Sequence, residues 1–180
     1  MERNLTHIAL FAALIAVLGL VPRVDLAAGV PITAQSLGIM LCGTVLGAKR
    51  GALAVLLFLL LVALGLPLLS GGRGGLGVFV GPSAGFLVGF PIAAFVAGWI
   101  MERTTLPPFW AAASGGVIGG IGVLYVFGIS GMAIVLDKTL SEAALLGLGF
   151  LPGDVIKAAL AGLVTQAIAR ARPGALLARA

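Results

Sequence analysis

The sequence predicts an all-α, polytopic membrane protein with six transmembrane helices in a single domain, residues 1–180. Of the 180 residues, 61% are hydrophobic and 9% are charged, and the mean hydropathy is +1.22. A soluble domain carries roughly 25% charged residues, so this composition cannot cover a surface that faces water. In a bilayer the backbone must be hydrogen-bonded within helices or a closed barrel, and the sequence lacks the polar–apolar alternation of barrel strands. Helices are therefore expected, and a soluble enzyme is excluded.

Long segments without charge locate the helices. No acidic or basic residue occurs in the stretches 26–48, 51–72, 74–101 and 104–136, and each stretch can hold the roughly 20 apolar residues that cross a bilayer. With the apolar runs near the two ends of the chain, these stretches predict spans over about residues 5–21, 33–48, 51–69, 81–101, 109–128 and 152–170.

Proline marks several of the expected boundaries. Pro22 and Pro31 bracket the first connection, and Pro82 lies in the opening turn of the fourth span. Pro107 and Pro108 precede the fifth span. The first span is expected to be a helix and not a signal peptide, because no small-residue cleavage site follows it. The second span is short and rich in glycine, which predicts a tilted or interrupted helix.

The basic residues predict the orientation in the membrane. An even number of spans places both termini on one side, and seven basic residues share that side against three on the other. The first group is Arg3, Lys49, Arg50, Arg103, Arg170, Arg172 and Arg179, and the second is Arg23, Arg73 and Lys138. The positive-inside rule therefore predicts cytoplasmic termini. The connections 22–32, 70–80 and 129–151 then face outward and predict a mouth open to the exterior. The scattered basic residues do not indicate nucleic-acid binding.

Small residues form stripes on several spans. They are Gly81, Gly85 and Gly89 on the fourth span, Gly115, Gly116, Gly119 and Gly120 on the fifth, and Ala9, Ala12, Ala13 and Ala16 on the first. Such stripes let helix backbones approach closely, so the glycines predict tight helix contacts. For the alanines, internal packing is the simpler interpretation, and an exposed docking surface for a separate membrane subunit is the alternative.

Familiar cofactor and catalytic motifs are absent. Residues 72–77 spell G-x-G-x-x-G, but they follow a membrane helix where a dinucleotide site requires a strand. Residues 43–49 read GTVLGAK, which is not a Walker A motif, so this chain is not expected to hydrolyse ATP. The single Cys42 and single His7 exclude a Cys/His metal cluster and an internal disulfide. No resident cofactor or metal is expected, and the chain is not expected to be an enzyme.

Asp154 and Lys157 are the exception to the apolar character of the spans. They are three residues apart near the start of the last span, and hence on one helical face. An ionisable residue inside a span indicates a functional site by default. A structural interpretation competes with this one, because an acid suits the first turn of a helix and the lysine can simply pair with it. The functional hypothesis is a polar ligand whose donors meet the carboxylate and whose acceptors meet the ammonium.

Two blocks of the sequence resemble a known family. The stretch from Pro31 to Phe90, PITAQSLGIMLCGTVLGAKRGALAVLLFLLLVALGLPLLSGGRGGLGVFVGPSAGFLVGF, and the stretch PGDVIKA from Pro152 to Ala158 resemble the biotin-specific substrate-binding component (BioY) of energy-coupling factor (ECF) transporters. The family's typical GPTGGY appears here as GPSAGF, so Phe86 replaces a tyrosine and lacks its hydroxyl.

The resemblance implies an ECF S-component-like bundle of six helices that binds biotin on its outer side. It also implies partners: a transmembrane T component, which would contact the small-residue face of the first helix, and two ABC-type ATPases, which would hydrolyse the ATP. The expected location is the bacterial cytoplasmic (inner) membrane. Whether the chain forms a homo-oligomer is left open by the resemblance.

The same resemblance implies ligand contacts, and the chemistry of biotin agrees with them. Asp154 can accept from the two ureido N–H groups, and Lys157 can donate to the ureido carbonyl. Phe79 and Phe86 are expected to wall the thiophane ring, and Arg73 is a candidate for the valerate carboxylate, with a solvated loop charge as the alternative. Further expected contacts at the outer mouth are Ser83, Thr33 and Gln35, the last two with capping of the second span as the alternative.

Two other functions compete with this one. A stand-alone facilitator or ion-coupled carrier for a small polar solute would need a coupling site near the midplane, where the sequence places no charge. An integral membrane enzyme would need a nucleophile with a base or a metal cluster.

Overall fold

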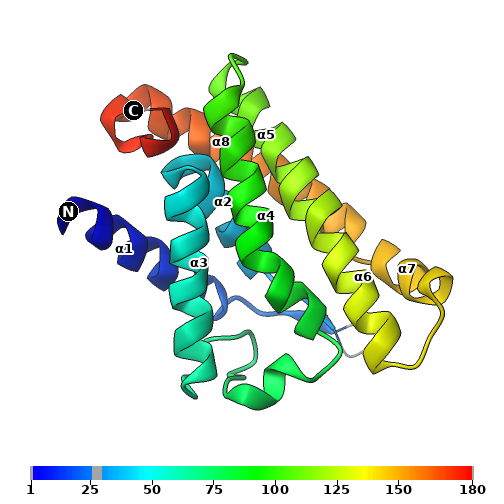
Figure 1. Cartoon of the computed structure of the whole chain (residues 1–180). Helices are drawn as coiled ribbons and strands as arrows, with labels where there is room; N and C mark the ends of the chain where they lie inside the picture. Colours follow the sequence, from blue (N-terminus) through cyan, green and yellow to red (C-terminus); the bar gives the residue numbers. More distant parts are fainter. Residues whose placement is uncertain (1, 26–29, 180) are drawn as a thin grey trace.

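The computed structural model describes residues 2–25 and 30–179 and is almost entirely helical (Figure 1). The helices are α1 (Glu2–Leu18), α2 (Gln35–Leu46), α3 (Ala48–Ala63), α4 (Ala84–Arg103), α5 (Pro108–Val117), α6 (Leu124–Val135), α7 (Leu140–Leu148) and α8 (Leu151–Ala171). A π-helical segment, Ile118–Val123, joins α5 to α6 in one 28-residue helix. Within the described residues the chain thus has seven helices, and α4, α5–α6 and α8 are long and apolar enough to cross a membrane.

Each expected span corresponds to a helix, but two boundaries differ. The third helix ends at Ala63 and not near residue 69, because Gly65 adopts φ +103° and Pro67 follows, a combination that terminates helices. The fifth helix continues to Val135. The segment 129–151, expected to be an outer loop, therefore contains the end of α6 and all of α7.

A capping box starts α7. The Thr139 hydroxyl accepts from the Glu142 amide at 3.3 Å, and the Glu142 carboxylate accepts from the Thr139 amide at 2.9 Å. The hydrogen bonds from the Thr139 side chain and backbone hold the pKa of Glu142 below its ordinary value. These reciprocal bonds satisfy amides that a helix start otherwise leaves unpaired.

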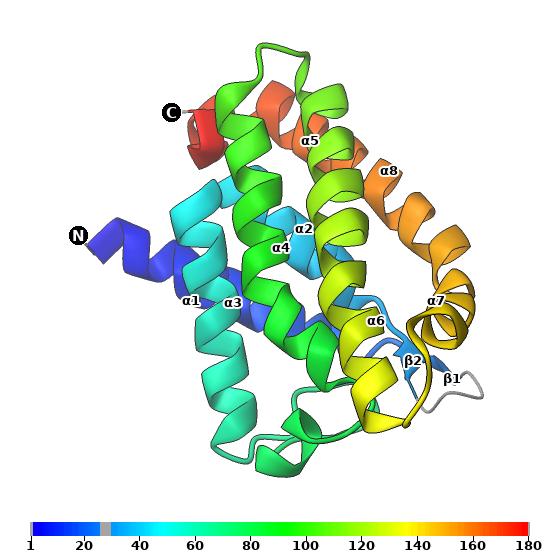
Figure 2. The ribbon, with the colours of Figure 1, turned by 45° about the vertical axis from the view of Figure 1, so that its right-hand side comes forward.

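Helix α4 lies at the centre of the bundle. It packs against α2, α3, α5 and α6, while α8 packs mainly on α5 and α2. Helix α1 crosses obliquely against α3 and α2, and its N-terminal end projects to one side (Figures 1 and 2). Between α2 and α3 the chain reverses at Gly47, whose φ of +90° favours glycine.

The two ends of the bundle differ in construction. The α2–α3 and α4–α5 turns lie at one end with the C-terminus (Figure 2). The short antiparallel pair β1 (Val24–Asp25) and β2 (Pro31–Ile32), the 64–83 connection and α7 lie at the other. We call the first the turn end and the second the loop end.

The C-terminal segment folds back onto the turn end. Leu176, Leu177 and Ala178 are buried there, in contact with α2 and α4. The Arg179 guanidinium donates to the carbonyls of Thr104 at 3.1 Å and Leu106 at 2.7 Å. Carbonyls just past a helix C-terminus lack helical partners, so the arginine completes this end of the bundle.

Most of the glycine stripes are tight helix contacts, as predicted. Gly115 and Gly119 face Ala97 on α4, whereas Gly116 and Gly120 on the other side of the same helix face α8 and Met40 of α2. On α4, Gly85 lies against the backbone of α6 and Gly89 against Phe127. Gly81 differs, because nothing lies within 4 Å of where its Cβ would be.

These contacts predict whether two glycine substitutions in the π-helical segment raise or lower the stability of the fold. A Cβ at Gly119 would lie 2.5 Å from the Ala93 carbonyl oxygen, whereas a Cβ at Gly122 meets no atom closer than 3.7 Å. Overpacking costs about 1–3 kcal/mol, while glycine to alanine inside a helix gains up to about 1 kcal/mol. We expect Gly119→Ala to lower the thermal unfolding temperature and Gly122→Ala to leave it unchanged or raise it. If the two variants changed the unfolding temperature equally, this packing would be contradicted.

Candidate functional site

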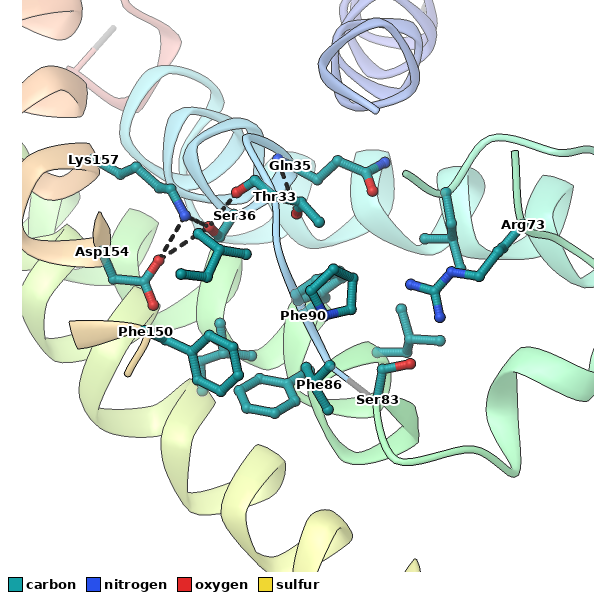
Figure 3. Close-up of a pocket in the computed structure, with 16 residues that line it drawn as sticks. Thr33, Gln35, Ser36, Arg73, Ser83, Phe86, Phe90, Phe150, Asp154 and Lys157 are labelled. Atoms are coloured by element: carbon teal, nitrogen blue, oxygen red, sulfur yellow. Dashed lines mark hydrogen bonds and ion pairs between the residues drawn. The ribbon is translucent and has the colours of Figure 1, made fainter. Parts of the chain in front are cut away.

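A cavity opens at the loop end, between the first turns of α2, α4 and α8 (Figure 3). It measures about 600 Å³ with the open solvent at its mouth included, a size typical of small-molecule sites. The lining consists of Val30, Pro31, Ile32, Thr33, Gln35, Ser36, Leu69, Arg73, Ser83, Phe86, Leu87, Phe90, Leu124, Phe150, Asp154 and Lys157. All the predicted ligand residues except Phe79 are among them.

Asp154 and Lys157 form an ion pair in the wall of this cavity. The Lys157 Nζ lies 2.9 Å from Asp154 Oδ1, and the two side chains are 13% and 8% exposed. Ser36 joins them, because its Oγ accepts from Lys157 Nζ at 2.9 Å and donates to Asp154 Oδ1 at 3.2 Å. The Tyr125 hydroxyl donates to Asp154 Oδ2 at 2.9 Å. The pairing expected under the structural interpretation therefore occurs, and it occurs beside a cavity.

Three helices bring this group together. Asp154 and Lys157 lie one turn apart on α8, and Ser36 is in the first turn of α2. Tyr125 is the second residue of α6, just after the π-helical segment. A π-helical segment shifts the register of the residues that follow it. The tyrosine hydroxyl thus meets an acid 29 positions further along the chain.

The pair keeps hydrogen-bonding capacity for a further group. A carboxylate offers about four acceptor positions and an ammonium three donors. In the described part of the chain, Asp154 accepts three hydrogen bonds and Lys157 donates two. A small molecule that presents one N–H donor and a carbonyl side by side fits the one acceptor position and the one donor that are left.

Aromatic rings line the middle of the cavity. Phe86 contacts Phe150 edge-to-face at a centroid distance of 5.8 Å and contacts Tyr125 in the same manner at 6.4 Å. Phe90, one turn along α4, adds a third lining ring. Phe79 instead packs against the hydrophobic core from the short 3-10 helix Leu76–Phe79. The expected aromatic wall thus exists, but Phe90 and Phe150 take the place given to Phe79.

Arg73 lies across the cavity from the ion pair, with the phenylalanines between them (Figure 3). Its Nε donates to the Ser70 carbonyl at 3.3 Å, and the Arg23 guanidinium donates to the same carbonyl at 3.0 Å. The cavity therefore has a polar group at each end and an apolar middle.

Gln35 uses its side chain to connect three segments. Its Nε2 donates to the Ile15 carbonyl at 3.1 Å and to the Leu68 carbonyl at 3.0 Å, while its Oε1 accepts from the Ser70 amide at 3.1 Å. The residue is 2% exposed. These bonds occupy both amide hydrogens, which favours a structural role for Gln35.

Thr33 and Ser83 lie at the starts of two helices. The Thr33 Oγ1 accepts from the Gln35 amide at 3.3 Å, as the capping alternative for this residue predicted. Ser83 is buried and immediately precedes α4, without a capping hydrogen bond from its side chain.

The alanines of α1 divide between two faces. Ala9 and Ala13 are exposed, Ala16 is half-buried, and Ala12 is buried in the core at 3% exposure. Any docking surface on this helix is therefore formed by the side that carries Ala9 and Ala13, and Ala12 does not contribute to it.

Four residues of the candidate site were not predicted from the sequence, namely Ser36, Tyr125, Phe90 and Phe150. Ser36 follows Gln35 at a helix start, where its hydroxyl was open to interpretation as a cap. Tyr125 is the only tyrosine in the chain, and a hydroxyl inside an apolar span needs a partner. That signal could have linked it to one of the few buried acids.

Comparisons with known proteins agree on one family. A model of the BioY family matches residues 2–174 of this chain. The biotin transporter BioY of Rhodobacter capsulatus is 54% identical over 189 aligned positions, which cover 99% of this chain and 100% of that protein. The biotin transporter BioY of Rhizobium etli is 52% identical over 177 positions, 92% of each chain.

A solved structure is also similar. It is the crystal structure of the S-component for biotin from an ECF-type ABC transporter, with a TM-score of 0.88 and 31% sequence identity. The match covers 94% of this chain and 92% of that one.

The bonding of Gln35 predicts a stability effect that does not depend on any ligand. Gln35→Leu leaves the Leu68 carbonyl and the Ser70 amide without their partner, while the Ile15 carbonyl keeps its bond from the Gly19 amide. Each buried group without a partner costs about 1–3 kcal/mol. We expect a destabilisation of roughly 2 kcal/mol or more, measured as thermal unfolding in detergent. Thr33→Val, which removes one capping bond, is the control and should cost about 1 kcal/mol. An unfolding temperature unchanged by Gln35→Leu would point to a ligand contact.

Proposed function

The chain belongs to the BioY family, and from that premise we propose that it is the membrane subunit that captures biotin for an ECF-type transporter. The observation that carries this function is the cavity with an ion pair at one end, an arginine at the other and phenylalanines between them. Biotin has the same order of chemistry: a ureido ring with two N–H donors and a carbonyl, an apolar thiophane ring, and a valerate carboxylate.

The ureido ring binds at the ion pair. Asp154 accepts from one ureido N–H group and Lys157 donates to the ureido carbonyl. Hydrogen bonds to charged groups are roughly twice as strong as neutral ones, and the low exposure of both side chains strengthens them further. Ser36 and Tyr125 support this arrangement because they hold the carboxylate in a fixed orientation.

The rest of biotin extends toward Arg73. The thiophane ring packs against Phe86 and Phe150, and the valerate chain carries its carboxylate to the guanidinium. Phe86 acts only through its ring, since it has no hydroxyl. Ser83 and Thr33, which also line the cavity, are polar neighbours of the bound molecule near its mouth.

The protein spans the bacterial cytoplasmic membrane six times in this proposal. The spans are α1, α2, α3, α4, the continuous α5–α6 and α8, and α7 lies at the outer surface. The turn end, which carries Lys49, Arg50 and Arg103, faces the cytoplasm under the positive-inside rule. The loop end and its cavity then face outward, and both termini are cytoplasmic.

Import requires partner subunits. We assign them as a T component and two ABC-type ATPases, and the T component docks on the exposed side of α1. This side carries Ala9 and Ala13 between Leu5 and Val17, which are 65% and 58% exposed. Small residues at four-residue spacing permit the close approach of a second helix.

Asp154→Asn tests the ligand assignment. We expect the purified wild-type chain to bind labelled biotin, and the variant to bind it roughly 10- to 100-fold more weakly, because hydrogen bonds to a charged group contribute about 1.5–3 kcal/mol. Asp137→Asn is the matched control, since Asp137 is exposed in a turn with φ +51° that asparagine also tolerates. Folding of each variant is checked by gel filtration. Full biotin affinity in folded Asp154→Asn would make the acid purely structural.

Ala9→Leu combined with Ala13→Leu tests the docking surface. We expect the double variant to bind biotin normally but to lose co-purification with the T component and uptake in cells that express all subunits. Ala159→Leu with Ala167→Leu, at two exposed positions of α8, is the control and should preserve both. An intact complex in the α1 variant would refute this surface. Uptake by cells lacking the ATPases would instead favour a stand-alone carrier.

A further inference from the structure

A second groove lies at the turn end, far from the biotin cavity. It is formed where the first turn of α3 meets the last turns of α4, two helices that stand side by side (Figures 1 and 2). The groove measures about 770 Å³ with open solvent included. Its lining is Ala48, Lys49, Arg50, Phe95, Trp99, Glu102 and Arg103.

Cations outnumber acids in this groove. Lys49, Arg50 and Arg103 contribute three positive charges against the single carboxylate of Glu102. That carboxylate accepts from the Ala48 amide at 2.8 Å. Among the described residues, none of the three cations has a carboxylate within salt-bridge distance. The groove therefore presents a positive potential that the rest of the described chain does not neutralise.

Exposed apolar surface leads away from the cations along both helices. On α4, Ile92, Phe95 and Trp99 are 38%, 41% and 48% exposed, and on α3, Leu53 and Leu56 are 51% and 49% exposed. Their spacing of three to four residues places each set on one helical face. The ligand that fits such a surface is amphipathic, with a negatively charged head and apolar chains.

We propose that this groove binds an anionic phospholipid, whose phosphate meets Lys49, Arg50 and Arg103 and whose acyl chains lie along α3 and α4. Basic pockets between membrane helices on the cytoplasmic side suit such headgroups. Trp99 lines the groove together with the cations, and tryptophan is enriched at membrane–water interfaces.

The test uses the purified chain in detergent with defined lipids. We expect dioleoyl phosphatidylglycerol to raise the thermal unfolding temperature and to be retained in native mass spectrometry, and dioleoyl phosphatidylcholine to do neither. Lys49→Gln with Arg103→Gln should weaken phosphatidylglycerol binding on the order of 30-fold, or about fivefold for each cation removed. Biotin binding by the variant should stay at the wild-type level, which also verifies its fold.

Arg170→Gln with Arg172→Gln removes two exposed charges near the same end of the molecule but outside the groove. This matched variant should retain phosphatidylglycerol binding. If it lost as much affinity as Lys49→Gln with Arg103→Gln, the effect would come from net charge and not from the groove. An equal stabilisation by soluble glycerol 3-phosphate would show that the groove binds a phosphate ester without lipid chains. If Lys49→Gln with Arg103→Gln kept its lipid and lost only co-purification with the T component, the groove would be a protein-docking site. Any of these three results would overturn the proposal.

Discussion

The buried ion pair of α8 is the constraint on which the loop end depends. Removing two charges from water costs several kcal/mol per ion, and the cost is offset only if every partner is in place. Asp154 gains Lys157, two hydroxyls and the positive end of α8, and those hydroxyls come from α2 and α6. The three helices must therefore meet within hydrogen-bonding distance. The same requirement fixes the shape of the cavity, since Ser36 is one of its lining residues.

Much of the fold could be predicted because membrane helices obey two local rules. Charge-free stretches located α2, α3, α4 and α5, and apolar runs near the ends of the chain located α1 and α8. The glycine stripes of α4 and α5 indicated where the helices touch. Boundaries set by local chemistry were also readable in principle: Gly65 with Pro67 ends α3, and Thr139 with Glu142 starts α7. The continuation of the fifth helix was not readable, because Gly128 suggests a break and is instead packed against Phe86.

The candidate site could be predicted only in part, because some of its residues are set by local chemistry and others by how distant segments pack together. Asp154 and Lys157 stand out because charge in an apolar span is costly wherever the chain folds. The choice between Phe79 and Phe150 depends on how a loop and a short helix turn relative to the bundle, and spacing along the chain does not encode that. Gln35 shows the opposite error, in which a residue predicted to contact the ligand has a structural role. A polar residue at a helix start resembles a ligand contact until its three backbone partners are known.

The C-terminal segment bears on how a solute could leave the pocket toward the inside. Leu176, Leu177 and Ala178 are packed against the ends of α2 and α4, and Arg179 holds the chain there. A straight exit through the interior would have to break this packing and part α4 from its neighbours. A tilt of the whole rigid bundle within the bilayer would expose the pocket to the opposite side with every internal contact preserved. The closed turn end thus favours motion of the body as a unit over a channel that opens through it.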